Sequence, residues 1–232
     1  MTGWWMHSLY ESSGGAAAVV SWTFWVILSI VLHELAHGWA ALWQGDDTPR
    51  RMGHMTWNPL VHMGPMSLLM FAAIGIAWGL MPVDPSRFRW RRRGRIVVSA
   101  AGPAMNIALA ILTLFFLLPL WLRLGLGRID DPLFSNVAEF FYIGGLLNVV
   151  LAIFNLLPIP PLDGSSILAG LWMKWYIWIQ NPQFMMIGFF ILLAVFFSGI
   201  GGLFFDAAGA IAHGVFRGGT VVFGGPGSFR FG

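Results

Sequence analysis

Cysteine is absent from this chain of 232 residues, and charged residues make up only 10% of it. The lack of cysteine excludes disulfide bonds and thiolate metal ligands. A soluble domain carries about 25% charged residues, so the shortage of charge excludes an ordinary soluble domain. The 13 Lys and Arg residues leave a net charge of only +3, which does not indicate a nucleic-acid partner.

Hydrophobic residues make up 57% of the chain and gather in long runs. A helix that crosses a bilayer needs about 20 apolar residues. Five stretches meet or approach that length: 16–43, 60–83, 96–122, 140–162 and 175–205. Glycine and proline interrupt the second of them. The sequence therefore predicts an all-α polytopic membrane protein with about 4–6 transmembrane helices and one re-entrant or broken segment.

The chain shows no internal repeat and no second, soluble part. We expect residues 1–216 to form a single transmembrane domain. The last residues, 217–232, read RGGTVVFGGPGSFRFG, and their glycine content predicts a flexible tail.

The stretch HELAH places three titratable residues, His33, Glu34 and His37, inside the first apolar run. Residues four apart lie on one face of an α-helix, so the two imidazoles can bind one metal ion. Glu34 then lies beside the ion, where a general base toward water is needed. Two alternatives to a metal site are that the motif arises by chance and that these residues simply lie at the membrane interface. The apolar run continues beyond His37, and ionisable residues within a span are usually functional.

A catalytic zinc site usually has a third protein ligand. Asp163 follows the proline-rich turn PIPP at the end of an apolar run, where a helix must break. It could instead cap a helix that starts at Ser165. Beside the HELAH motif, the ligand interpretation is the stronger. His54 and His62 are ligand candidates by composition alone, and we expect His62 to lie near the ion without binding it.

The paired motifs HELAH and NLLPIPPLDG resemble those of the site-2 protease family, the intramembrane zinc metalloproteases of peptidase family M50. GDDTPRRMGHMTWNPLVH and AGPAMN resemble further elements of its compact bacterial members, so the resemblance runs from about Val31 to Asp163. It implies that one Zn²⁺ ion is bound by His33, His37 and Asp163.

The same resemblance implies that Glu34 is the catalytic base and that Asn155 contacts the substrate or the oxyanion. His62 and Asn106 are expected next to the site or in the loop that guides the substrate.

The implied function is an intramembrane zinc endopeptidase that cuts membrane proteins within or near a transmembrane segment. It would lie in the cell (inner) membrane, in contact with lipid and without a nucleic-acid partner, and the oligomeric state stays open. A transporter or channel would also place polar residues in the membrane. An inactive family member that serves as a binding scaffold is a third possibility.

Two arginine clusters predict the orientation. Arg50 and Arg51 follow the first apolar stretch, and six arginines between residues 87 and 95 precede the third. Positive residues favour the cytoplasmic side, so both clusters and the active site are expected there. Residues 60–83 would then enter and return as a re-entrant element, although a kinked full crossing remains the alternative. The N-terminus would be extracytoplasmic.

Overall fold

The computed structural model describes residues 5–12, 15–125, 131–198 and 200–223. These residues form helices and turns and no β-strand, so the predicted all-α fold is confirmed. In chain order the elements are α1 (Trp5–Ser12), α2 (Ala16–Trp43), α3 (Thr48–Arg51), α4 (Pro59–Ile74), the 3₁₀ turn η1 (Pro85–Arg87), α5 (Arg91–Ala110), the π-helical segment η2 (Ile111–Leu117), α6 (Leu118–Leu124), α7 (Pro132–Asn155), α8 (Asp163–Leu171), α9 (Met173–Ile179), α10 (Pro182–Phe197) and α11 (Ile200–Phe223).

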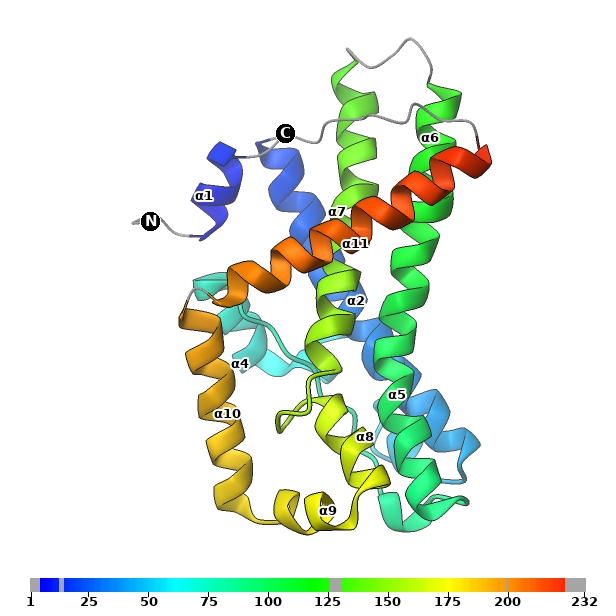
Figure 1. The fold of residues 1–232 in the computed structure, drawn as a ribbon, viewed down its shortest axis with the longest axis vertical. Coiled ribbons are helices and arrows are strands. Elements are labelled where there is room, and N and C mark those ends of the chain that lie inside the picture. The colour runs from blue at the N-terminus through cyan, green and yellow to red at the C-terminus, as the bar shows by residue number, and fades with distance from the viewer. Residues whose placement is uncertain (1–4, 13–14, 126–130, 199, 224–232) are drawn as a thin grey trace.

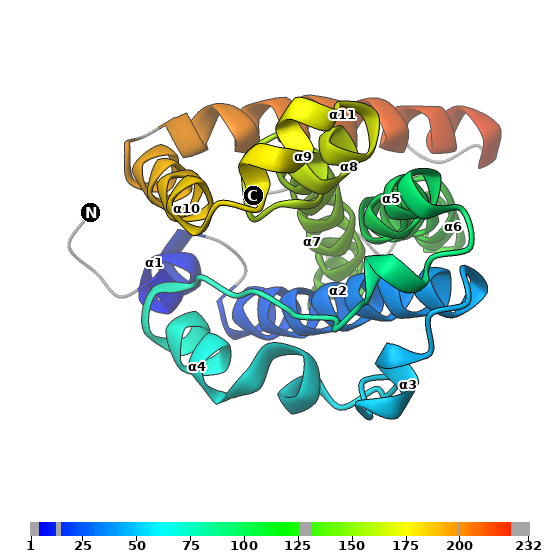
Figure 2. The same ribbon diagram turned by 90° about the horizontal axis from the view of Figure 1, so that it is seen from below.

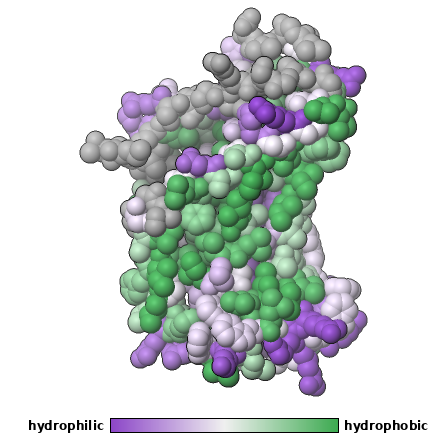
Figure 3. Space-filling model, in the orientation of Figure 1, coloured by the Kyte–Doolittle hydropathy of each residue, from purple (hydrophilic) through white to green (hydrophobic). Residues whose placement is uncertain are grey.

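Among the described residues, three helices are long and apolar enough to cross a membrane: α2, the continuous helix Arg91–Leu124 and α7. A bent pair, α9 with α10, would make a fourth span if its 87° break is counted within one crossing. Counting the bent pair gives four spans, the lowest of the predicted 4–6, and leaving it out gives three. Figure 1 shows the three long helices side by side. In Figure 3 a hydrophobic band separates hydrophilic residues at the two ends, as a multi-pass membrane protein requires.

Small residues let the three long helices approach closely. Gly144 on α7 lies against the ring of Trp25 on α2, and Gly145 lies against Leu114 of η2. A methyl group at either position would overlap its neighbour. Close packing over small residues is the usual way in which helices associate in lipid, where no hydrophobic effect drives them together.

The segment expected to be broken or re-entrant folds back on itself. Helix α4 is interrupted at Gly64, where φ is 68° and ψ is 167°, and it ends at Gly75 with φ at 80°. The chain then returns along α4: the backbone N–H of Trp78 donates to the Ser67 hydroxyl at 2.8 Å, and that of Leu80 donates to the His62 carbonyl at 2.9 Å. A helix of 16 residues with this return does not form a continuous span.

Helix α11 runs obliquely across α7 and the segment η2–α6 (Figures 1 and 2). It continues to Phe223, past residue 217 where the sequence predicts a flexible tail to begin. Within this part, Gly219 lies against the backbone of Phe115 and the ring of Pro119. The rest of the predicted tail, 224–232, lies outside the described residues.

Candidate metal centre

Three side chains from two helices converge at one point in the bundle. His33 and His37 lie one turn apart on α2, and Asp163 is the first residue of α8. The Nε2 atoms of the two histidines are 3.0 Å apart, and they lie 3.1 and 3.3 Å from Asp163 Oδ2. All three side chains are largely buried. The structure thus brings together the three residues that the sequence singles out as ligands.

Asp163 does not cap its helix. Leu162 occupies the capping position of α8, with no side-chain capping bond, and the Asp163 carboxylate turns toward the two imidazoles. The alternative interpretation of Asp163 as a helix cap is therefore wrong.

The hydrogens of the imidazoles point away from this cluster. His37 Nδ1 lies 2.7 Å from the Val98 carbonyl, and His33 Nδ1 lies 2.7 Å from Asn106 Oδ1. A carbonyl oxygen only accepts, so Nδ1 carries the hydrogen, and in a neutral imidazole Nε2 then presents a lone pair. Two nitrogen lone pairs and a carboxylate oxygen then face one another, and Asp163 Oδ2 has no hydrogen-bond donor among the described residues.

Such a set of acceptors fits a zinc ion. Tetrahedral ligands about 2.0–2.1 Å from zinc lie about 3.3 Å from one another, and the three separations here are 3.0, 3.1 and 3.3 Å. Two imidazoles and one carboxylate are also a ligand set that zinc accepts in catalytic sites.

Gly102 on α5 allows that helix to pass directly beside the cluster. A Cβ atom there would overlap His37 Nε2 and would lie 2.5 Å from His33 Nε2. The glycine within AGPAMN is therefore part of the site, because any side chain at residue 102 would displace the imidazoles.

Glu34 lies beside the histidines on α2 and is buried. The returning segment 76–83 passes over it at Gly79, where a Cβ atom would overlap Glu34 Oε1 and would lie 2.6 Å from its Cγ. The sequence indicated Gly79 only as a helix breaker. Its close contact with Glu34 has no sequence signal apart from the glycine itself.

Asn106 contacts His33 beside the three-residue cluster and is fully buried. Its Nδ2 donates to Asn148 Oδ1 on α7 at 2.9 Å, and Asn148 Nδ2 donates to the Ser29 hydroxyl on α2 at 2.9 Å. Sequence reasoning missed Asn148 and Ser29. An uncharged polar residue within an apolar helix was the only signal.

His62 and Asn155 lie outside the three-residue cluster. His62 is buried on α4, and its Nε2 donates to the Thr56 carbonyl at 2.7 Å. Asn155 ends α7, and its Nδ2 donates to the Leu151 carbonyl at 3.0 Å. His54 makes a local contact, with Nδ1 3.0 Å from the Met52 carbonyl.

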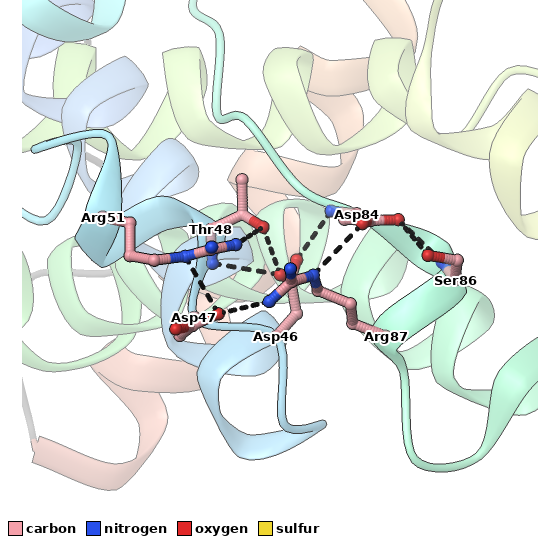
Figure 4. Close-up of polar contacts among 7 residues, drawn as sticks. All are labelled: Asp46, Asp47, Thr48, Arg51, Asp84, Ser86 and Arg87. Carbon is pink, nitrogen blue, oxygen red and sulfur yellow. Dashed lines mark hydrogen bonds and ion pairs between the residues drawn. The ribbon is translucent and has the colours of Figure 1, made fainter.

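The connectors on either side of α4 are joined by a polar cluster (Figure 4). Asp46, which is fully buried, accepts from the backbone and hydroxyl of Thr48 and from the backbone N–H of Asp84 at 2.6 Å. The hydroxyl and backbone N–H of Ser86, together with Arg87, hold the pKa of the half-exposed Asp84 below its ordinary value. Asp46 thereby fixes the end of the segment that covers Glu34.

Fold and site together define a multi-pass helical membrane protein with a His-His-Asp cluster that could hold a metal ion beside a glutamate. A sequence profile described as "Peptidase family M50" matches residues 124–198. The chain is 39% identical over 147 residues to "Putative zinc metalloprotease YwhC" of Bacillus subtilis, a match that covers 63% of this chain and 66% of the relative.

Two further relatives carry the same description. Rip2 of Mycolicibacterium smegmatis is 33% identical over 61% of this chain and 53% of its own length. MJ0611 of Methanocaldococcus jannaschii is 32% identical over 64% of this chain and 67% of its own length. No solved structure shows a significant match. The matched region spans about half to two thirds of these curated relatives. The chain belongs to peptidase family M50.

Proposed function

We propose that this protein is an intramembrane zinc endopeptidase that hydrolyses membrane proteins within or near a transmembrane segment. One observation carries the proposal: two imidazole lone pairs and a carboxylate oxygen converge within 3.3 Å of one another, directly beside a buried glutamate. The relatives support it, since each is named "Putative zinc metalloprotease".

His33, His37 and Asp163 hold one Zn²⁺ ion in this proposal. Zinc in such a site makes water acidic enough to act as a nucleophile near neutral pH and polarises a peptide carbonyl. The chain turns Nε2 of both imidazoles toward the ion by holding their Nδ1 hydrogens on Val98 and Asn106.

Glu34 is the general acid–base. Its carboxylate takes a proton from the attacking water as the new C–O bond forms, and then gives that proton to the amine nitrogen as the C–N bond breaks. Gly79 leaves room for the carboxylate. Asn155 donates its amide N–H to the oxyanion of the scissile carbonyl, which requires it to leave the Leu151 carbonyl.

In this proposal the arginine clusters set the orientation of the protein in the membrane. Both arginine clusters lie at the end of the bundle where α2 ends and α5 begins. By the positive-inside rule that end faces the cytoplasm of the cell (inner) membrane, which places the active site toward the cytoplasmic side.

Cleavage of single-span peptides by purified, zinc-loaded protein tests the proposal. Wild-type protein should cut, lose activity to a chelator and regain it with zinc. Glu34→Gln should keep its zinc but cleave about 10²–10⁴-fold more slowly, because the base is gone and the ligands are not. Glu11→Gln, at an exposed acid on α1, is the matched control.

The other candidates give different outcomes. Zinc binding without cleavage of any peptide would favour an inactive scaffold. A protein that binds no zinc but carries ions in vesicles would favour a transporter or channel.

A further inference from the structure

A network of buried amides leads from the metal centre through α5 to α7. His33 Nδ1 lies 2.7 Å from Asn106 Oδ1, and Asn106 Nδ2 lies 2.9 Å from Asn148 Oδ1. Asn148 Nδ2 lies 2.8 Å from the Gly144 carbonyl and 2.9 Å from the Ser29 hydroxyl. Ser29, Asn106 and Asn148 are fully buried, so water does not compete for these bonds.

At the far end of this network, the orientation of the Asn148 amide is fixed. The Gly144 carbonyl can only accept, whereas the Ser29 hydroxyl can donate or accept. Asn148 must therefore turn its NH₂ group toward Gly144, because the reverse orientation would place two oxygens 2.8 Å apart. Its oxygen then faces Asn106.

The orientation of Asn148 determines that of Asn106 and, through it, the position of the hydrogen on His33. Because Asn148 presents an oxygen, Asn106 must present its NH₂ group to Asn148 and its own oxygen to His33. A neutral imidazole carries one hydrogen, which must then lie on Nδ1. The Nε2 atom of His33 is left unprotonated and faces Asp163 and His37.

We propose that Asn148 is a positioning residue that, through Asn106, fixes the tautomer of His33 so that Nε2 is free to bind zinc. His37 needs no such chain, because the Val98 carbonyl sets its tautomer directly. The proposal rests on the proposed function in one respect, that the site takes zinc. The Asn106 amide could by itself lie either way round, and the Gly144 carbonyl fixes its orientation through Asn148.

The test compares Asn148→Leu with the double variant Asn106→Asp/Asn148→Leu. Leucine removes the group that orients Asn106, whose amide can then turn its NH₂ group toward His33 and favour the wrong tautomer. Both oxygens of the carboxylate introduced by Asn106→Asp are acceptors, so this side chain offers an oxygen to His33 in either orientation. Thr113→Val is the control, since Thr113 is fully buried but bonds only to carbonyls of its own helical turn.

Two readouts are needed on full-length protein in detergent. The first is zinc affinity by chelator competition, which should fall about 10–100-fold in Asn148→Leu and recover in the double variant. The second is the ¹⁵N NMR signal of His33 in zinc-free protein, assigned by its loss in His33→Asn. It should report hydrogen on Nδ1 in the wild type and a mixture with Nε2 in Asn148→Leu.

Two results would overturn the inference. One is an Asn148→Leu protein with wild-type zinc affinity and an unchanged His33 tautomer. The other is a loss that Asn106→Asp fails to restore, which would mean that Asn148 serves only packing. The zinc-free NMR readout decides the matter even if the wild type cleaves no peptide, so failure of the proposed function is a separate result.

Discussion

At the scale of single residues, Asp163 joins two parts of the chain that are more than 100 residues apart in sequence. We expect Asp163→Ala to lose both zinc and cleavage, because two imidazoles alone leave the site without its carboxylate ligand. Metal analysis of the purified variant checks this. Full zinc occupancy in Asp163→Ala would indicate another ligand, with His54 and His62 as the first to examine.

Gly79 should affect chemistry without affecting metal binding. A methyl group there would overlap the Glu34 carboxylate but touch none of the three ligands among its nearest neighbours. Gly79→Ala is expected to lose most cleavage activity and to keep its zinc. Paired measurements of zinc content and cleavage rate test the expectation, which fails if zinc and activity fall together.

Gly102 should behave in the opposite way. Its added methyl group would overlap the Nε2 atoms that face the metal site. Gly102→Ala is expected to bind zinc much more weakly, and cleavage should decline in proportion to the zinc lost. An active, zinc-loaded Gly102→Ala protein would show that α5 can move away from the histidines at little cost.

At the scale of elements, Asp46 connects the end of α2 to the segment that covers Glu34. Asp46→Ala would leave the backbone N–H groups of Thr48 and Asp84 without their acceptor, a loss of about 1–3 kcal/mol per buried group. We expect a lower thermal midpoint and slower cleavage with zinc retained. The control is Asp47→Ala, whose ion pairs with Arg51 and Arg87 are about half exposed and contribute about 0–1 kcal/mol. Equal effects of the two variants would contradict this assignment.

The elements also show what could be predicted from sequence. The pairing of His33 with His37 follows from the helical period, and the position of Asp163 follows from the prolines that break the chain before it. Asn148 could not be found in this way, because an amide in an apolar helix has possible partners on every neighbouring helix. The sequence indicated Gly79 as a helix breaker and Gly219 as part of a flexible tail, yet both permit close approach. Such contacts depend on tertiary packing, which a single sequence does not encode locally.

At the scale of the whole molecule, the two ends of the bundle should lie on opposite sides of the membrane. Met52 and Arg89 are exposed near the end of α2 and the start of α5, and Leu133 is exposed at the start of α7. Single cysteines are informative because the chain has none. In spheroplasts, an impermeant maleimide should label Leu133→Cys but label Met52→Cys and Arg89→Cys only after lysis. Labelling of Arg89→Cys from outside would mean that residues 59–90 cross the membrane.

The distance along the chain between HELAH and Asp163 also has a consequence in time. A ribosome that adds about 5–20 residues per second places His33 and His37 in the bilayer on the order of ten seconds before it makes Asp163. During that interval the nascent chain carries the glutamate and two imidazoles but has no carboxylate to close the centre. On the proposed function, a peptidase under synthesis stays unable to cut the membrane proteins inserted beside it until α8 has been made and has folded against α2 and α5.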